Sequence, residues 1–337
     1  MSLATKYRPV IWEDVIGQNN IVEILNKQLE QNNIKNTYIF SGASGCGKTT
    51  VARLFINKLN RGVGSPLELD AASNSGVDNV REIVKLAQER SIDSEYKAYI
   101  IDECHALSNQ AWQAFLKCIE EPPKYTIFIF CTTEPSKIPD TIKNRCMRFN
   151  FNRINSDLIY QRLLYISNNE KCNNVEDTCD YISRICNGEM RNAISMLEKC
   201  IDYSHNLDIN NTLTCLGDYS YDTYFSLVDS IIDGNTKNVF EIISSIYNNG
   251  ANLVKFIDTF LDFNLDVLKY ILYNDIKITK LPITLLDKLK YSTSIENSQK
   301  YYFYIIDNLL DTKNMLKYNN NIKSTIEVMF SKMCRLV

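Results

Sequence analysis

Short apolar runs alternate with longer segments of helical periodicity over the first 152 residues of the chain. The runs are rich in β-branched and aromatic residues, which is typical of buried parallel strands. They lie at residues 38–40, 67–70, 99–102, 126–131 and 147–151. Helices are predicted at residues 50–59 and at 109–121, where Pro122 and Pro123 prevent continuation. This alternation predicts an α/β domain in which helices cover a parallel sheet.

Beyond residue 155 the strand pattern is absent and only helical periodicity remains. The clearest helical segments are residues 158–168, 175–186, 190–202, 251–273 and 295–316. Phe225, Val228, Ile231 and Ile232 follow the spacing of one helix face. We therefore expect the α/β domain to be followed by a small and then a larger helical domain. The expected domains are residues 1–152, 153–217 and 218–337.

A glycine-rich run between the first strand and the first helix carries the strongest chemical signal. Gly42-Ala43-Ser44-Gly45-Cys46-Gly47-Lys48-Thr49 fits the pattern G-x-x-x-x-G-K-[ST], a phosphate-binding loop. Its glycines let backbone N–H groups turn toward a phosphate, at which the next helix points its positive end. Lys48 can reach the β- and γ-phosphates, and the Thr49 hydroxyl can bind magnesium. The expected nucleotide-binding residues are Gly42, Ala43, Ser44, Gly45, Cys46, Gly47, Lys48, Thr49 and Thr50.

Two acidic residues follow the strand predicted at residues 99–102. An acid at the carboxyl end of a strand lies on the binding edge of an α/β sheet. There Asp102 can hold magnesium through water, and Glu103 can orient and polarise an attacking water. A solvated surface pair is the alternative, but the phosphate loop in the same chain favours a nucleotide hydrolase.

The composition and net charge of the chain limit the classes of molecule that it is expected to bind. With 337 residues and a net charge of −3, the chain is not the basic protein expected of a dedicated nucleic-acid binder. Nucleic-acid contacts would therefore come from a local patch, or from several subunits together. No apolar stretch approaches the roughly 18–20 residues of a membrane span, and residues 1–9 are not a secretory signal. We expect a soluble cytoplasmic protein without a membrane partner.

The chain has eleven cysteines but no C-x-x-C pair. Most lie in apolar contexts, which favours reduced thiols in a packed core. Cys172, Cys179 and Cys186 repeat at intervals of seven, so a metal site on one helix face is the less favoured alternative. The two histidines, His105 and His205, are too few for a histidine-based metal centre.

Several motifs occur together and in order. They are Lys6-Tyr7-Arg8-Pro9, Trp12-Glu13-Asp14-Val15-Ile16-Gly17-Gln18, the phosphate loop, Asp70-Ala71-Ala72-Ser73-Asn74, Asp102-Glu103-Cys104-His105, Glu120-Glu121-Pro122-Pro123, Thr132-Thr133-Glu134-Pro135 and Gly188-Glu189-Met190-Arg191-Asn192-Ala193. Together they resemble the gamma/tau-type ATPase subunit of bacterial DNA polymerase III clamp loaders, within the AAA+ superfamily. The resemblance is dense over the first 200 residues and rests on helix pattern alone over the last 120.

The resemblance implies a five-stranded parallel sheet with the phosphate-loop strand central, a helical lid and an all-α collar. It implies a pentameric ring of identical or different subunits that opens a sliding clamp with ATP, places it on primer–template DNA and releases it upon hydrolysis. A hexameric AAA+ DNA motor, of the branch-migration or helicase type, is the alternative. The collar-like helices and the run Glu120-Glu121-Pro122-Pro123 favour the clamp loader. A scaffold that binds ATP without hydrolysis is a third interpretation, which the intact loop and acids oppose.

The resemblance also assigns roles to individual residues. Arg8, Val15 and Ile16 would line the adenine and ribose pocket, although Val15 and Ile16 would serve equally as core residues. Thr133 and Arg191 would be the first and second sensors of the γ-phosphate. Arg145 would be the arginine finger that enters the site of the next subunit, with Asn144 replacing the usual serine before it.

Cofactors and partners follow from the same resemblance. ATP and Mg²⁺ are expected but zinc is not, because residues 60–65 bridge the place of the family's zinc module. The polymerase- and helicase-binding C-terminal tail of longer members is likewise not expected. Asn74, Ser75, Arg81 and Lys117 would contact DNA, although an ordinary helix start and surface cations explain them equally. Residues 108–115, with Trp112 and Phe115, are candidates for the clamp contact, although such aromatic residues more often serve the core.

Overall fold

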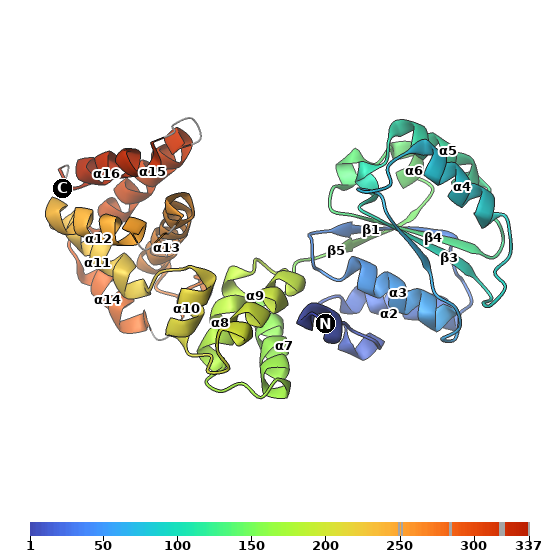
Figure 1. Ribbon diagram of the computed structural model, residues 1–337, viewed down its shortest axis with the longest axis horizontal. Helices are drawn as coiled ribbons and strands as arrows, with labels where there is room; N and C mark the ends of the chain where they lie inside the picture. Colours follow the sequence, from blue (N-terminus) through green and yellow to red (C-terminus); the bar gives the residue numbers. More distant parts are fainter. Residues whose placement is uncertain (249, 251, 283–284, 317–320, 336–337) are drawn as a thin grey trace. The chain divides into compact units, whose positions relative to one another are not determined.

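The computed structural model describes residues 1–248, 250, 252–282, 285–316 and 321–335 (Figure 1). The chain divides into two compact units. The N-terminal unit combines Met1–Leu163 with Cys186–Ser195, and the C-terminal unit combines Leu164–Ile185 with Met196–Val337. Two helices, α7 (Ser156–Asn169) and α9 (Met190–Tyr203), begin in the first unit and end in the second. The division into three domains stays a prediction.

The N-terminal unit is a five-stranded parallel sheet with helices on both faces (Figure 1). The strands are β1 (Thr37–Gly42), β2 (Leu67–Asp70), β3 (Lys97–Asp102), β4 (Thr126–Thr132) and β5 (Met147–Phe151). The helices are α1 (Leu3–Lys6), α2 (Asn19–Glu30), α3 (Lys48–Leu59), α4 (Val77–Ala87), α5 (Asn109–Glu120) and α6 (Asp140–Lys143), with short 3₁₀ helices η1 (Trp12–Asp14), η2 (Cys104–Ala106) and η3 (Pro135–Lys137). The predicted α/β fold is confirmed, and each of the five expected strands is present.

The strand order is β2-β3-β4-β1-β5, and every pair is parallel. The phosphate-loop strand β1 is internal, but the middle strand is β4, because only β5 lies beyond β1. The expectation of a central β1 is therefore wrong by one place. Since all strands run the same way, their carboxyl ends meet at one edge of the sheet, where the loops after β1, β3 and β4 come together.

Successive residues of the inner strands face opposite cores. On one side, Tyr38 and Phe40 pack with residues of α2 and α3. On the other, Ile39 and Phe128 pack with residues of α4, α5 and α6. The alternation with a period of two is what a strand covered on both faces requires.

The edge strand β2 departs from the prediction of a buried strand. Leu67 is 51% exposed, and three of the four residues of β2 are exposed. The sequence indicated a strand here correctly, but its position at the edge of the sheet depends on the order of strands, which the local pattern does not contain.

The C-terminal unit is built of helices and has an apolar core of its own. Its complete helices are α8 (Glu176–Ile185), α10 (Ile209–Leu216), α11 (Tyr221–Ile232), α12 (Thr236–Asn248), α13 (Leu253–Tyr273), α14 (Leu286–Ser294), α15 (Ser298–Leu316) and α16 (Ile322–Met333), with the 3₁₀ helix η4 (Ile276–Ile278). The predicted face of α11 is confirmed, because Phe225, Val228 and Ile231 are buried and Ile232 packs against the same core. The first residue of the predicted segment 251–273, Ala251, lies outside the described residues.

Candidate functional site

The phosphate loop lies between β1 and α3 and depends on glycine at two positions. Gly42 has φ +151°, and a Cβ atom there would lie 2.3 Å from the backbone oxygen of Phe151. Gly45 has φ +64°, and a Cβ atom there would lie 3.0 Å from Cβ of Arg191. The loop therefore passes closely between β5 and the start of α9, where only glycine fits without displacement.

Lys48 and Thr49 lie in the first turn of α3, which begins two residues earlier than the sequence predicted. Lys48 is only 6% exposed, and its Nζ donates to the carbonyl oxygens of Gly42 and Ala43 at 2.9 and 2.8 Å. The buried ammonium group is thus held over the loop. A phosphate at this helix start would meet the ammonium group and backbone N–H groups together.

Thr49 and Asp102 form the second part of the site. The Thr49 hydroxyl donates to Asp102 Oδ2 at 2.8 Å, which joins α3 to the carboxyl end of β3. The other oxygen, Asp102 Oδ1, accepts the backbone N–H of Glu103 at 3.0 Å. A hydroxyl and a carboxylate are the hard oxygen ligands that Mg²⁺ accepts, with substrate phosphates and water completing its shell. The donor set therefore fits magnesium.

Glu103 has an unusual backbone conformation, with φ +44° and ψ +43°. This left-handed conformation is uncommon for residues other than glycine and costs energy, so the surrounding structure must maintain it. The conformation ends β3 and turns the chain into η2. The Glu103 side chain accepts a hydrogen bond from the Thr133 hydroxyl, 3.1 Å from Oε2. The proposed water-orienting acid and first sensor are thus in direct contact.

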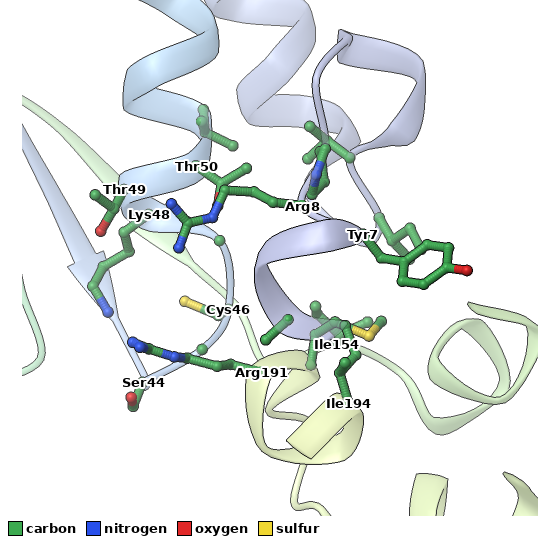
Figure 2. Close-up of a pocket in the computed structure, with 18 of the residues that line it drawn as sticks. Tyr7, Arg8, Ser44, Cys46, Lys48, Thr49, Thr50, Ile154, Arg191 and Ile194 are labelled. Atoms are coloured by element: carbon green, nitrogen blue, oxygen red, sulfur yellow. The ribbon is translucent and has the colours of Figure 1, made fainter. Parts of the chain in front are cut away.

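A cavity of about 270 Å³ lies beside these groups, and its lining residues come from the N-terminal unit. Figure 2 shows the charged ends of Arg8, Lys48 and Arg191 on one side of it and Ile154, Ile194 and the Tyr7 ring on the other. Burial, together with the positive charges of Arg53 and Arg191, lowers the pKa of Arg8, which nevertheless stays protonated at neutral pH. A cluster of cations in a half-buried cavity favours a ligand with several negative charges.

The opposite end of the cavity is apolar. Figure 2 shows Ile154 and Ile194 at this end, and the residues that line the cavity also include Val15 and Ile16, predicted from the sequence, and Met190. Ile154, Met190 and Ile194 were not predicted as lining residues. Ile154, in the β5–α7 connection, and Ile194, in α9, lie outside the motifs named above, and Met190 belongs to a motif in which only Arg191 was given a role. An apolar end next to a cationic end suits a ligand with an aromatic base and a phosphate chain.

Gln18 belongs to one of the sequence motifs but had no predicted role. Its side chain is 4% exposed. Its Nε2 donates to the backbone oxygens of Cys46, at 3.3 Å, and of Asn152, at 2.8 Å. Gln18 thus fastens the phosphate loop to the end of β5. The partners are distant in sequence, so only the folded chain shows this role.

Arg145 is not among the residues that line the cavity. Its Nη2 lies 2.8 Å from Glu120 Oε1, and its Nη1 donates to the backbone oxygen of Thr141 at 2.7 Å. Both charged side chains are 41% exposed. The structure therefore does not bring Arg145 to the cavity of its own chain, which is compatible with a role in a neighbouring one.

The predicted DNA-contacting residues lie at and beside the start of α4. Asn74 and Ser75 precede the helix, and Ser75 is exposed. Arg81 lies in α4 with its Nη1 3.1 Å from Asp78 Oδ1, and Lys117 is exposed on α5. The helices α4 and α5 pack on the same face of the sheet. Their basic residues are therefore available at the surface, but Asp78 shares the first turn of α4.

The proposed clamp contact through Trp112 and Phe115 is wrong. Trp112 is 3% exposed and Phe115 is fully buried, and both pack against Phe130 beneath α5. Aromatic residues at the spacing of an amphipathic helix serve the core here. Within residues 108–115, the exposed positions are Ser108, Asn109, Gln110 and Gln113.

The burial of the cysteines tests the prediction of reduced thiols in a packed core. Nine of the eleven cysteines are buried, and all eleven are free, which confirms the prediction of unpaired core thiols for those nine. Within the described ranges, no group of three or more His, Cys, Asp or Glu side chains is arranged to hold a metal ion. No helix in the same ranges is both long and apolar enough to span a membrane.

Comparisons with known sequences point to one kind of protein. The sequence model of a family described as DNA polymerase III, delta subunit, matches residues 67–155. The chain is 32% identical to the DNA polymerase III subunit tau of Bacillus subtilis (strain 168), over 98% of this chain and 62% of that protein. It is also 32% identical to the DNA polymerase III subunit gamma of Buchnera aphidicola subsp. Schizaphis graminum (strain Sg), over 74% of each chain. The chain thus spans less than two thirds of the Bacillus subtilis protein.

Among solved structures, the Thermotoga maritima RuvB Holliday junction branch migration motor has a similar fold. The TM-score is 0.53 with 16% sequence identity, over 67% of this chain and 80% of that one. At this level of identity the likeness concerns the fold alone.

Proposed function

Because the chain belongs to the family of DNA polymerase III gamma and tau subunits, we propose that it is the ATPase subunit of a DNA sliding-clamp loader. One observation carries the proposal. The folded chain brings Lys48, the Thr49–Asp102 pair and the Glu103–Thr133 pair to one edge of the sheet, beside a cavity with a cationic and an apolar end. This arrangement supports binding and hydrolysis of ATP.

In this proposal the loop N–H groups and Lys48 bind the phosphates, and Arg8, Val15 and Ile16 lie around the ribose and adenine. Thr49, with Asp102 acting through water, would hold magnesium, which neutralises charge on phosphate oxygens. Glu103 polarises the attacking water, and the Thr133 hydroxyl fixes its direction. Arg191, at the start of α9, approaches the γ-phosphate.

Arg145 completes the site of an adjoining subunit in this proposal. A planar guanidinium stabilises the charge that develops on the transferred phosphoryl group, an effect on the order of 10³–10⁵ in related hydrolases. The position of Arg145 outside the cavity of its own chain supports this role. A ring, which we propose to be pentameric, would place one subunit's Arg145 against the next subunit's nucleotide.

DNA and the clamp are the proposed partners, and the cytoplasm the proposed location. Asn74, Ser75, Arg81 and Lys117 would each contribute to contacts with DNA phosphates. Because the net charge of one chain is −3, binding would depend on several subunits that each neutralise a few phosphates. Such binding is independent of sequence and falls steeply with salt.

A hexameric DNA motor is the competing function, because motors such as RuvB share this fold. Fold alone does not discriminate between the two. The relatives with 32% identity support the clamp loader. The native mass of the assembly tests the difference, since a pentamer excludes a hexameric motor.

Two variants test the proposed function. Lys48→Ala should weaken ATP binding by about 10- to 100-fold, because a charge-assisted hydrogen bond contributes about 1.5–3 kcal/mol. Arg145→Ala should bind ATP normally but lose the turnover that primed DNA and a clamp stimulate, by about 10³-fold or more. Binding is measured by calorimetry and turnover by phosphate release.

The matched controls are Lys58→Ala, an exposed lysine of the same helix, and Arg148→Ala, an exposed arginine of β5. Both should behave like the wild type. Stimulated turnover of Arg145→Ala at the wild-type rate would show the finger assignment to be wrong, and unchanged ATP affinity of Lys48→Ala would overturn the nucleotide site.

A further inference from the structure

His105 lies between the two loops that carry Glu103 and Thr133. It belongs to η2, directly after the left-handed turn at Glu103, and its side chain is 17% exposed. The ring nitrogen Nδ1 lies 3.2 Å from the Thr132 hydroxyl oxygen and 3.3 Å from Glu103 Oε2. The other nitrogen, Nε2, lies 3.4 Å from Glu134 Oε1. One imidazole therefore connects the end of β3 to the end of β4.

The surroundings of His105 hold its ring in a fixed orientation. Thr132 is fully buried, and its hydroxyl oxygen also accepts the backbone N–H of Glu134 at 2.9 Å. Glu134 is in turn paired with Lys137, 3.0 Å from Oε1. The ring thus has polar partners at both nitrogens, and the groups that face it are Glu103, Thr132 and Glu134.

Glu103 has few other restraints on its side chain. Its Oε2 contacts the Thr133 hydroxyl and His105 Nδ1, and the side chain is 34% exposed. A carboxylate that must polarise one water needs a defined rotamer, and displacement of about 1 Å can cost on the order of 10²-fold in rate. A second contact at the same oxygen, from the half-buried ring of His105, would keep the carboxylate in one rotamer.

We propose that His105 is a positioning residue for hydrolysis: its Nδ1–H holds the Glu103 carboxylate beside Thr133, and so sets the direction from which Glu103 polarises water. This inference rests on the proposed function, and it adds a residue to which the sequence reasoning gave no role. His105 does not line the cavity, so its loss should lower kcat and leave ATP affinity unchanged.

Two conservative variants separate this role from mere packing. The side-chain amide nitrogen of asparagine reaches the position of Nδ1, whereas that of glutamine reaches the position of Nε2. His105→Asn therefore keeps a donor for Glu103, and His105→Gln keeps only the contact with Glu134. The proposal expects a loss of kcat of about 10- to 100-fold in His105→Ala and His105→Gln, and partial or full recovery in His105→Asn.

The experiment measures kcat and the Kd for ATP with the full chain, its ring partners, primed DNA and clamp. His205→Ala, which removes the chain's other histidine, is the matched control and should equal the wild type. Wild-type kcat in His105→Ala would overturn the inference, and so would equal losses in the asparagine and glutamine variants. If His105→Ala fails to fold, the comparison of kcat between His105→Asn and His105→Gln still tests the inference. Absence of turnover in the wild type would instead overturn the proposed function and this inference with it.

Discussion

Gly42 shows how one residue can serve the fold and the site together. It pairs with Phe151 across β1 and β5, and a Cβ atom would lie 2.3 Å from the Phe151 oxygen and 2.9 Å from its Cβ. The first glycine of the phosphate-binding pattern is therefore required by the sheet itself. The pattern predicted a glycine for phosphate approach, but its close contact with β5 depends on the fold.

Gly42→Ala should destabilise the N-terminal unit by more than about 2 kcal/mol, because the backbone of β5 would have to move. Both tryptophans, Trp12 and Trp112, are buried in this unit, so the urea midpoint of intrinsic fluorescence reports its unfolding. Gly76→Ala is the control, because Gly76 has φ −70° and open space around it. It should change stability by no more than about 0.5 kcal/mol. Equal midpoints for the two variants would contradict the steric argument.

At the scale of single residues, the sequence predicted site residues best where a short motif contains the functional groups. Lys48 and Thr49 follow from one short motif and Asp102 from another, 53 residues after Thr49, and the structure places Thr49 and Asp102 in contact. Gln18 was missed because its partners are far along the chain. The apolar lining from α9, and the contacts of His105 with Thr132 and Glu134, likewise depend on segments that only the fold brings together. The Gln18–Asn152 contact joins residues 134 positions apart. Such contacts exist only once the sheet order has been set.

Helix α5 illustrates what the sequence determines for a whole element. The predicted segment 109–121 agrees with Asn109–Glu120, because local signals mark both ends. Ser108 Oγ accepts the backbone N–H of Ala111 at 3.2 Å, and the two prolines follow the last turn. The buried face of α5 was less secure from sequence, since Trp112 was a candidate for a partner contact or for the core, and it lies in the core.

Ser108→Ala should destabilise the N-terminal unit by about 1 kcal/mol, because the helix loses its N-cap. Gln113→Ala, at an exposed position of the same helix, should change stability by less than about 0.5 kcal/mol. The fluorescence assay suits this pair, since Trp112 lies within α5. If the exposed control lost as much stability as the cap variant, the capping hydrogen bond would not be the cause.

At the scale of the whole molecule, one part of the proposed site is not completed within a single chain. Arg145 is outside the cavity of its own chain, so its proposed role needs a neighbour. The resemblance of motifs predicted this arrangement, but composition alone would have argued against DNA, since the chain is slightly acidic. In our proposal, the assembled ring both pools the positive charges that bind DNA and completes each catalytic site with a neighbour's Arg145.

Mixing two inactive variants tests the neighbour's contribution. A protomer with Arg145→Ala keeps Lys48, and a protomer with Lys48→Ala keeps Arg145. Where two copies adjoin in an assembly, the first binds ATP and the second supplies the guanidinium. The mixture should therefore hydrolyse ATP well above the sum of the separate variants, with assembly checked by native mass spectrometry. Turnover equal to that sum would mean that Arg145 acts elsewhere than in a neighbouring site.

The uneven burial of the thiols gives each unit one attachment point for a dye. Among the eleven cysteines, all within the described ranges, only Cys146 in the N-terminal unit and Cys215 in the C-terminal unit are partly exposed. Burial raises the pKa of Cys146 to about 11, so its reactive thiolate is scarce at neutral pH and increases as the pH rises. A donor dye and an acceptor dye can be attached to these two thiols as maleimides, with Cys146 labelled at a pH above neutral. Energy transfer between the dyes would then report any change in the distance between the units when nucleotide binds.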